Sequence, residues 1–470
     1  MKRLTSTLRA RLYAGSGVTA MVATLLAGCA FIPTYQRPEA PVAAAFPQPG
    51  ASTGTAATEL PWTDFLPDAR LRVLVDTALH NNRDLRVAVL NVEQTRALLG
   101  VQRADQWPSV GAGFNASRAP GVGGKEVSTY SLGLSVSAFE LDLFGRVKSL
   151  SEAALARYLA SDEGRRAAQV ALIATVASAD LALRADDELL AVTARTLASR
   201  EEGLKLVRVK FDGGVAAEPE LRATESLVAA ARASLIALQR QRQQDLNALV
   251  LLLGQPLPAT LPVVPALAAT AFADLPVGLT SEVLLQRPDV RQAEQLLIAS
   301  NANIGAARAA FFPRITLTGS AGVASSQLSG LFDNTAYTFT GQLLAPLFDA
   351  GRNEANLDAT RIAREIAVAQ YEKTVQTAFR EVADALAGRA TLVDQLAAQQ
   401  AQADAEARRL ELAELLYLGG VASQFDRLDA ERSTLAARQA VVQLQLARLQ
   451  NAVQLYRVLG GGTPVAVQAR

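Results

Sequence analysis

The second half of this 470-residue sequence repeats the pattern of the first half. The residues FDGGV at 211–215 return as YLGGV at 417–421, and the pair GR at 145–146 returns at 351–352, in both cases after about 206 residues. A register kept over such a distance indicates two copies of a whole structural unit rather than a shared short motif. The content of one copy therefore constrains the fold of the entire chain.

The N-terminus has the features of an export signal. Basic residues precede a short apolar run at 18–27, which is too short for a transmembrane helix. The run leads into LLAGC, which resembles a bacterial lipobox with Cys29 as the lipidated first residue of the mature protein. An ordinary buried thiol is the alternative. Cys29 is the only cysteine, so no disulfide forms within the chain.

These features divide the chain into four parts. Residues 1–28 form the signal peptide, and residues 29–60, rich in Pro, Ala, Gly and Thr, form a lipidated N-terminal tether. Ala30 rather than Asp follows Cys29, which by analogy with lipoprotein sorting favours the outer membrane. The two structural repeats occupy residues 61–260 and 261–470. Each contains a helix, then a β-hairpin (108–140 and 313–346), then a helical hairpin (146–253 and 352–459).

The hairpins are expected to be amphipathic strands. In residues 130–138 apolar side chains take every even position and Ser or Gly every odd one, and residues 315–323 and 337–342 show the same alternation. A period of two indicates a strand with one apolar and one polar face. The polar faces carry small hydroxyls rather than Lys and Glu, which suits a wet lumen on one side and lipid on the other.

Long helices make up the rest of each repeat. An opening helix is expected over residues 70–106, ended by Pro108. Residues 146–210 and 352–417 contain no Pro, and each would span roughly 95 Å as one helix. Gly-Gly turns then lead into return helices with the heptad spacing of a coiled coil. The heptad positions are Leu221, Val228, Leu235 and Leu249 in the first repeat, and Leu428, Leu435, Val442, Leu449 and Tyr456 in the second.

The strands require more than one chain. Four strands cannot close a barrel, and an open sheet edge cannot lie in lipid, because its backbone N–H and C=O groups find no partner there. Three chains would pool twelve strands, an acceptable barrel, and would bring their long helices together as a second tube. The residues therefore predict a homotrimer with one continuous bore.

With these pieces in this order, the sequence resembles the TolC-like outer-membrane factors, and among them the NodT-type lipoprotein branch of efflux channels. The resemblance covers essentially the whole mature chain. Its most specific stretches are RPDV at 287–290, NIGAARAAFFP at 303–313, FELDLFGR at 139–146 and PLFDAGR at 346–352. It implies a mainly α fold with a membrane β-barrel contribution: a trimer with four strands per chain in a shared twelve-stranded barrel, and coiled-coil helices in an α-barrel.

The resemblance also implies a function. Such a trimer is the outer-membrane channel of a tripartite pump, a passive export duct for small organic compounds. It is driven by an inner-membrane transporter of the RND type through a periplasmic membrane-fusion adaptor. The chain has no nucleotide-binding loop, so energy must come from a partner. The alternatives are a metal-ion efflux channel of the same architecture and a non-conducting structural lipoprotein of the periplasm.

No enzymatic site is expected. The only histidine, His80, lies within a helical pattern beside Asn81 and Asn82, where a solvated or capping role is favoured. The mature chain has no Met and its one Cys is modified, so no metal site is expected. No cofactor is expected beyond covalent lipid on Cys29, in the form of N-palmitoyl and S-diacylglycerol groups. A net charge of +1 gives no basic excess for nucleic acid.

Two aspartates mark the candidate periplasmic gate. Asp426 and Asp429 follow the second Gly-Gly turn and, three residues apart, share one helix face. Paired aspartates at this distance from the tip line the narrow entrance of TolC-like channels, so the resemblance implies a ring of carboxylates that favours cations and repels itself. The alternative is solvated carboxylates that pair with Arg427 or Arg432. The family prototype has a basic residue where this chain has Ala422.

The Gly-Gly turns are the other candidate surface. Glycine permits a left-handed backbone and leaves room for another backbone to approach. The resemblance implies that the tips dock the adaptor, whereas on local grounds each is only a helix turn that needs no partner. The copies also differ, because Glu220 and Ala223 stand in the first repeat where the second has its aspartates. The candidate docking residues are Phe211, Gly214, Val215, Tyr417, Gly420, Val421 and Ser423.

Overall fold

The computed structural model describes residues 31–47, 57, 59–120, 124, 126–263, 266–275 and 280–462. Cys29 and the signal peptide therefore lie outside the described residues. The described chain divides into two units, and each takes segments from both repeats. One unit contains residues 31–39, 90–162 and 292–373, and the other contains the described residues of 40–89, 163–291 and 374–462.

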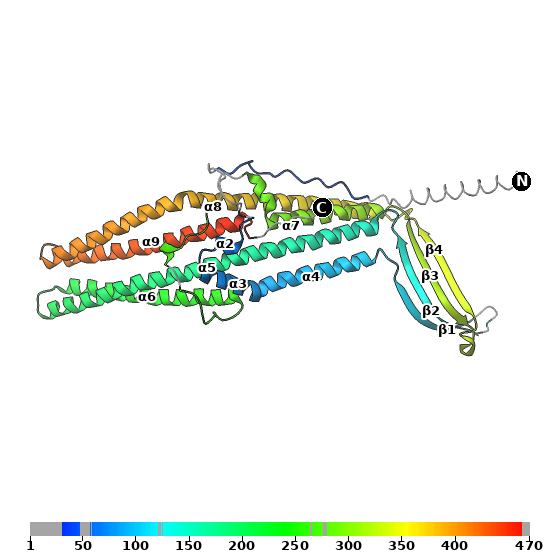
Figure 1. Cartoon of the computed structure of the whole chain (residues 1–470), viewed down its shortest axis with the longest axis horizontal. Helices are drawn as coiled ribbons and strands as arrows, with labels where there is room; N and C mark the ends of the chain where they lie inside the picture. Colours follow the sequence, from blue (N-terminus) through cyan, green and yellow to red (C-terminus); the bar gives the residue numbers. More distant parts are fainter. Residues whose placement is uncertain are drawn as a thin grey trace. The chain divides into compact units, whose positions relative to one another are not determined.

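The elements follow a duplicated order (Figure 1). The first half contains α2 (Trp62–Phe65), α3 (Ala69–Asn81), α4 (Arg83–Ala104), β1 (Val110–Pro120), β2 (Glu126–Leu141), α5 (Arg146–Asp212) and α6 (Glu218–Leu253). The second half contains α7 (Pro288–Ala309), β3 (Arg314–Ser325), β4 (Thr335–Leu344), α8 (Arg352–Leu418) and α9 (Gln424–Val458), with short 3-10 turns at Leu267–Ala269, Ser281–Gln286 and Leu328–Gly330.

The prediction of one opening helix over residues 70–106 was wrong. The chain breaks at Asn82, which has an extended backbone (ψ 131°) between α3 and α4. The side chain of Asn82 is buried: its Oδ1 accepts a hydrogen bond from the N–H of Leu85 and its Nδ2 donates to the carbonyl of Leu252. Asn82 thus caps α4 and ties it to α6. The amphipathic pattern continues past Asn82, so the local sequence does not indicate the break. The α6 carbonyl that Asn82 binds is distant in sequence.

The four predicted strands form one antiparallel sheet in the order β1-β2-β3-β4 (Figure 1). The pairings match the apolar positions of neighbouring strands: Leu132 lies opposite Phe114 on one side and Val323 on the other. On β4, Tyr337 lies opposite Ala321 and Phe339 opposite Gly319, in neighbouring rows of the same face. One face of the whole sheet is therefore apolar, while Ser, Thr, Asn, Gln and Gly make up most of the other, as the alternation predicts.

A bulge in β2 keeps this face continuous. Between Val136 and Phe139 the strand has one residue more than the facing segment of β3, and Ala138 adopts a left-handed backbone (φ 48°). Apolar residues occupy even positions before the bulge and odd positions after it, as at Phe139 and Leu141. Because an extra residue inverts the alternation, both sets point to the same face.

The start of the N-terminal tether is extended but docked along α7. Glu294 accepts hydrogen bonds from Tyr35 and Arg37, and the side chains of Asn301 and Arg308 donate to the carbonyls of Pro33 and Phe31. These α7 residues are spaced by two helical turns each. An extended segment of six residues and a helix of fourteen residues both span about 20 Å, so the two backbones stay in register. The residues from 31 to 37 are therefore a strap.

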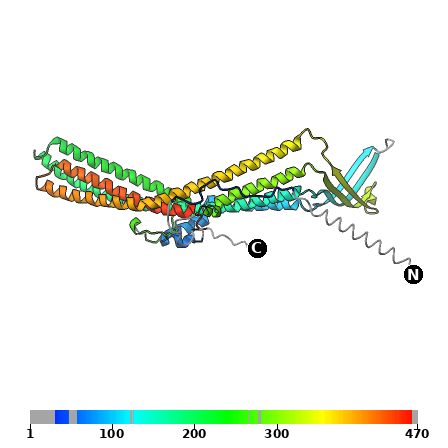
Figure 2. The ribbon, with the colours of Figure 1, turned by 90° about the horizontal axis from the view of Figure 1, so that it is seen from above.

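The long helices pair as predicted (Figure 2). Helices α5 and α8 each contain 67 residues. Ion pairs such as Arg242–Asp187 join α6 to α5, and Arg409–Asp429 joins α9 to α8. The heptad positions are buried, except that Leu235 and Leu435 are half-buried. An 18-residue window of α5 is apolar enough for a membrane helix, but half of it is buried within the chain.

The RPDV motif forms a buried ionic node. The guanidinium of Arg287 donates to both carboxylate oxygens of Asp289, to Glu381 on α8 and to the carbonyl of Val458 at the end of α9. Burial alone would raise the pKa of Asp289, but the hydrogen bonds and charge of Arg287 lower it. The node thus joins the start of α7 to both long helices of the second repeat.

A second buried carboxyl behaves in the opposite way. Asp186 on α5 is 6% exposed, and burial together with a hydrogen bond shared with Asp245 on α6 raises its pKa to about 7, although Arg242 acts against this. In an unfolded chain an aspartate titrates near about 3.9. The folded protein therefore holds this proton more tightly. Its contribution to stability is present below the unfolded pKa and is lost as the pH rises through about 7.

We predict that unfolding becomes easier as the pH rises toward and through this value. Asp186→Asn, which keeps the shape and cannot ionise, should flatten the fall of the thermal unfolding midpoint from about pH 5 to about pH 8 and raise the midpoint at the upper end. Asp394→Asn is the control, because Asp394 is exposed on α8 and is not among the groups that shift the pKa of Asp186. An unchanged pH slope in Asp186→Asn would contradict the assignment.

Candidate functional site: hairpin tips and the strand–helix junction

The two hairpin tips have the same backbone structure. Each long helix ends in a Gly-Gly turn whose second glycine is left-handed, with φ 72° at Gly214 and 75° at Gly420. The N–H of Val215 bonds the carbonyl of Lys210 at 2.8 Å, and that of Val421 bonds Leu416 at 2.9 Å. This is the six-residue closure of a Schellman motif, which requires glycine at the left-handed position. The duplicated turn is therefore a duplicated helix cap.

The tips present apolar side chains to solvent in the chain. Val215 and Val421 are 81% and 78% exposed. A Cβ at Gly214 or Gly420 would meet no atom within 4 Å, so each glycine leaves open space outside the turn. Of the other candidate docking residues, Phe211 and Tyr417 are half-buried and Ser423 is exposed. The predicted docking residues therefore gather at two apolar caps.

A contact that sequence reasoning missed joins the two tips. Lys210 Nζ, at the end of α5, donates to the hydroxyl of Tyr417 at 2.9 Å and lies 4.7 Å from the centre of its ring. The guanidinium of Arg427 from α9 lies 5.7 Å from the same ring. Two cations therefore flank one aromatic side chain. No local sequence pattern indicates this contact, because Lys210 and Tyr417 lie 207 residues apart.

The first candidate gate residue has a structural role. Asp426 closes a capping box at the start of α9: the Ser423 side chain accepts from the N–H of Asp426, and the Asp426 carboxylate accepts from the N–H and hydroxyl of Ser423. These hydrogen bonds lower the pKa of Asp426. The equivalent helix α6 starts at Ala217 without a side-chain cap. The repeats thus differ here, as the sequence indicated.

The second candidate gate residue is held by arginines. Asp429 pairs with Arg432 on its own helix at 2.7 Å and with Arg409 on α8 at 3.2 Å. The sequence raised Arg432 as a partner but missed Arg409. Arg427 instead donates to Gln424 and lies 3.9 Å from Glu431. Asp426 and Asp429 therefore share the first turns of α9, each with partners in its own chain.

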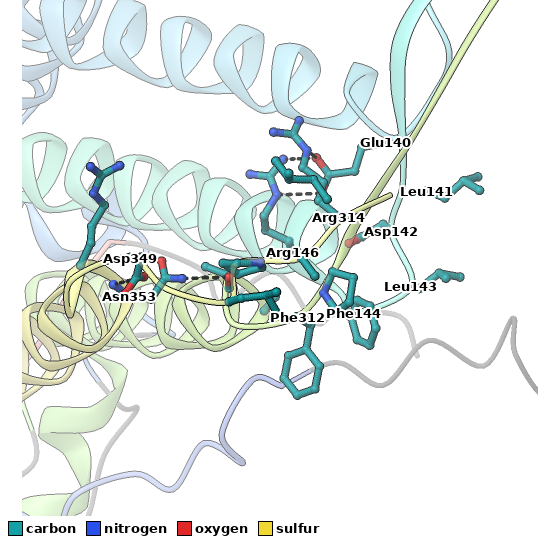
Figure 3. Close-up of a pocket in the computed structure, with 18 of the residues that line it drawn as sticks. Glu140, Leu141, Asp142, Leu143, Phe144, Arg146, Phe312, Arg314, Asp349 and Asn353 are labelled. Carbon is teal, nitrogen blue, oxygen red and sulfur yellow. Dashed lines mark hydrogen bonds and ion pairs between the residues drawn. The ribbon is translucent and has the colours of Figure 1, made fainter. Parts of the chain in front are cut away.

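The junction of strands and helices contains an ion cluster (Figure 3). Glu140, near the end of β2, accepts from Arg146 at 2.7 Å and pairs with Arg314 at the start of β3 at 2.6 Å. Phe144 and Phe312 stack nearby with ring centres 4.8 Å apart, and Phe31 of the strap stacks on Phe312 at 4.6 Å. These residues, except Phe31, line a cavity of about 790 Å³.

The same junction starts the two longest helices in the same way. Asp142 accepts from the N–H of Lys148, and Asp349 accepts from the N–H groups of Gly351 and Asn353. Both aspartates belong to the motifs FELDLFGR and PLFDAGR. Capping of exposed helix N–H groups explains why Asp stands at both positions.

The described residues show no arrangement suited to catalysis. In the part of the chain that the structure describes, no group of three or more His, Cys, Asp or Glu side chains is placed to hold a metal ion. His80 is exposed, and its Nδ1 lies 2.8 Å from the carbonyl of Asp76 one turn earlier. The lipidation residue Cys29 lies outside the described residues.

Comparison with known proteins places the geometry in context. The model of a family described as "Outer membrane efflux protein" matches two segments, residues 74–255 and 279–461. The chain is 45% identical over 458 residues to the toluene efflux pump outer membrane protein TtgC of Pseudomonas putida, covering 94% of each chain. It is 44% identical over 458 residues to the outer membrane protein OprJ of Pseudomonas aeruginosa, covering 95% of this chain and 96% of OprJ.

Solved structures share the fold. The open state of the MtrE outer membrane channel of Neisseria gonorrhoeae superposes with a TM-score of 0.86 at 41% identity, covering 93% of this chain and 99% of that one. A structure of CusC gives a TM-score of 0.83 at 38% identity, covering 92% and 100%. The observed helices and sheet are therefore those of an outer-membrane channel.

We predict that Ser423→Ala loosens the start of α9 without unfolding the hairpin. The substitution removes both hydrogen bonds of the Ser423 hydroxyl and leaves only the bond from the backbone N–H of residue 423 to Asp426. Loss of a typical Ser cap costs about 1 kcal/mol. Hydrogen exchange of the first turn of α9 should accelerate several-fold, while exchange in the centre of α9 is unchanged. Ala217→Ser, at the uncapped equivalent position of α6, should slow exchange there. Equal hydrogen-exchange rates of the first turn of α9 in the wild type and in Ser423→Ala would show that the cap does not stabilise this helix end.

Proposed function

Because this chain belongs to the outer membrane efflux protein family and is an outer-membrane efflux channel subunit, we propose that three copies form a passive export duct for small organic compounds. A periplasmic membrane-fusion adaptor connects the duct to an inner-membrane RND-type pump. The energy comes from that pump, since the duct needs only to conduct.

The sheet carries this proposal. Strands β1 and β4 lie at its edges, and no described strand pairs with the outer row of backbone N–H and C=O groups along either of them. Lipid tolerates no such edge, so β1 of one copy pairs with β4 of the next. Twelve strands then close, with the continuous apolar face toward lipid and the hydroxyl-rich face toward water.

The cargo follows from the polar face and from the relatives. The names of three relatives from Pseudomonas putida include toluene, solvent and antibiotic efflux. The polar face carries small hydroxyls such as Thr316, Thr318 and Ser320. A wide aqueous duct of this kind admits many small organic compounds, and the pump selects among them. Metal-ion export through the same architecture is the alternative.

We assign adaptor docking to the two tips. Val215 and Val421 are exposed apolar side chains beside glycines with open space around them, which suits the close approach of another helical hairpin. The capped helix ends hold these side chains in place. The candidate docking set remains Phe211, Gly214, Val215, Tyr417, Gly420, Val421 and Ser423.

We assign the periplasmic gate to Asp426 and Asp429. In a trimer they supply two carboxylates per chain at the narrow end of the helical tube. Asp429 is 45% exposed at its side chain, and its arginine partners are also exposed, so these pairs are weak and exchange with solvent cations. The family prototype has a basic residue at the position of Ala422, and this chain does not. Arg409 and Arg432 supply basic groups near the gate instead.

Lipidation of Cys29 completes the membrane attachment. The strap ends at Phe31, stacked in the junction cluster, and Cys29 is only two residues earlier in sequence. Lipid on Cys29 would therefore be anchored within about 10 Å of Phe31, given the reach of an extended chain.

The duct is tested by single-channel recording. Purified trimer in a planar bilayer should give trimer-dependent current steps that carry both small cations and organic ions. Phe339→Pro, which removes an N–H from the outer edge of β4, should insert poorly. The absence of trimer-dependent current in the wild type would favour the structural lipoprotein.

The gate is tested by charge removal. Asp426→Ala with Asp429→Ala should raise the conductance several-fold and weaken block by divalent cations, because a ring of carboxylates binds such cations. Asp394→Ala is the control for lost charge. It is exposed on α8, about 36 Å along the helix from Leu418. Unchanged conductance and block in the double variant would remove these aspartates from the gate.

Lipidation is tested by mass and insertion. Cys29→Ser should lose the mass of the N-acyl and diacylglycerol groups yet still yield inserted trimer, since the barrel itself holds the membrane. Failure of the variant to assemble would make the lipid part of the folding pathway. An unchanged mass would exclude lipidation at this residue.

A further inference from the structure

A small cavity lies between three helices beside the tips. Its volume is about 160 Å³, and its wall includes Gly203 of α5, Glu414 and Tyr417 of α8, and Gln424 and Arg427 of α9. The gate and docking residues do not explain it, because only Tyr417 belongs to those sets.

A buried hydrogen-bond donor in its wall has no partner. Gln424 is 4% exposed, and its Oε1 accepts from Arg427 Nε at 3.1 Å. Its Nε2 has no partner among the described residues. A buried donor without an acceptor is unfavourable, so the site favours a ligand that accepts hydrogen bonds.

The charges around the cavity favour an anion. The carboxylate nearest to Arg427 belongs to Glu431, at 3.9 Å, and Glu431 already pairs with buried Arg200 at 3.0 Å. Lys210 adds a second cation at the ring of Tyr417. Arg427 and Glu414 are the charged residues in the wall of the cavity, while Arg200 and Glu431 pair with each other behind it. Lys210 at the Tyr417 ring therefore leaves one positive charge in excess around the cavity.

The backbone provides room for the ligand. Gln424 and Arg427 lie in the first turn of α9, beside the capping box of Ser423 and Asp426. On α5, a Cβ at Gly203 would lie 3.2 Å from Arg427 Nη2, tighter than ordinary contact. Glycine at this position lets the guanidinium rest against α5.

We propose that the cavity binds one chloride ion, which accepts hydrogen bonds from Gln424 Nε2 and the Arg427 guanidinium. The bound ion balances the excess charge and holds α5, α8 and α9 together beside the tips. Release of the ion loosens the contact between the tips. Anion binding thus regulates the gate. The effect of the ion on current rests on the proposed function, whereas its binding does not.

Binding is tested on the full-length trimer in detergent. Crystals soaked in sodium bromide should show an anomalous peak between Gln424 and Arg427. The thermal unfolding midpoint should be several degrees higher in sodium chloride than in sodium gluconate at equal ionic strength, and the difference should saturate with chloride. No peak, or a peak without a chloride-dependent midpoint, would overturn the proposal, the latter by showing an adventitious ion only.

Variants separate this site from general salt effects. Gln424→Leu should abolish the chloride-dependent difference. Gln424→Glu supplies a tethered carboxylate, so the trimer should be as stable in gluconate as the wild type is in chloride. Arg222→Gln, exposed on α6 in pairs with Glu218 and Glu225, should keep the wild-type response. A chloride response that persists in both Gln424 variants would overturn the site.

The readouts also distinguish this proposal from the proposed function. If chloride binds as described but the trimer carries no current in any salt, the proposed export function is wrong and the chloride site stands. If current flows but neither the peak nor the midpoint depends on halide, the site is wrong and the duct stands.

Discussion

A β-strand in lipid must have every backbone N–H and C=O group paired, and most of this structure depends on that requirement. In the part of the chain that the structure describes, four strands pair with one another and the outer edges of β1 and β4 have no partner strand. The cost of an unpaired group in hydrocarbon is several kcal/mol, so a row of them cannot be tolerated. The chain is therefore complete only as part of a closed assembly. Its duplicated architecture follows, since each repeat provides one hairpin and one pair of helices to that assembly.

The same requirement explains small features of the sheet. The bulge at Ala138 adds one residue to β2 at the place where the apolar residues shift from even to odd positions. Without it, Phe139 and Leu141 would point into the polar face. Beyond the sheet, Asp142 and Asp349 cap the first turns of α5 and α8. Strand and helix are thus joined by short segments in which backbone groups are again paired by side chains.

At the tips, duplication and divergence have different roles. The Schellman closures at Gly214 and Gly420 are nearly identical, because the turn geometry demands glycine in both copies. The residues after the turns are free to differ, and only the second repeat carries the capping box of Ser423 and Asp426. The tyrosine of the second tip, Tyr417, then meets a lysine of the first. The contacts between the two tips are therefore asymmetric, although the turns themselves are alike.

The sequence by itself determined the repeat, the four strands, the long helices and the tip glycines, because each rests on a local period or on a turn that only certain residues permit. The helix break at Asn82 could not be predicted, since its reason is a carbonyl on α6 some 170 residues away. For the same reason Lys210, Arg409 and Gln424 carried no local signal, and the strap was predicted only as a tether, without its docking on α7. Only the tertiary structure decided which charges meet, because ion pairs, buried donors and cavities depend on distances between helices that no periodicity records.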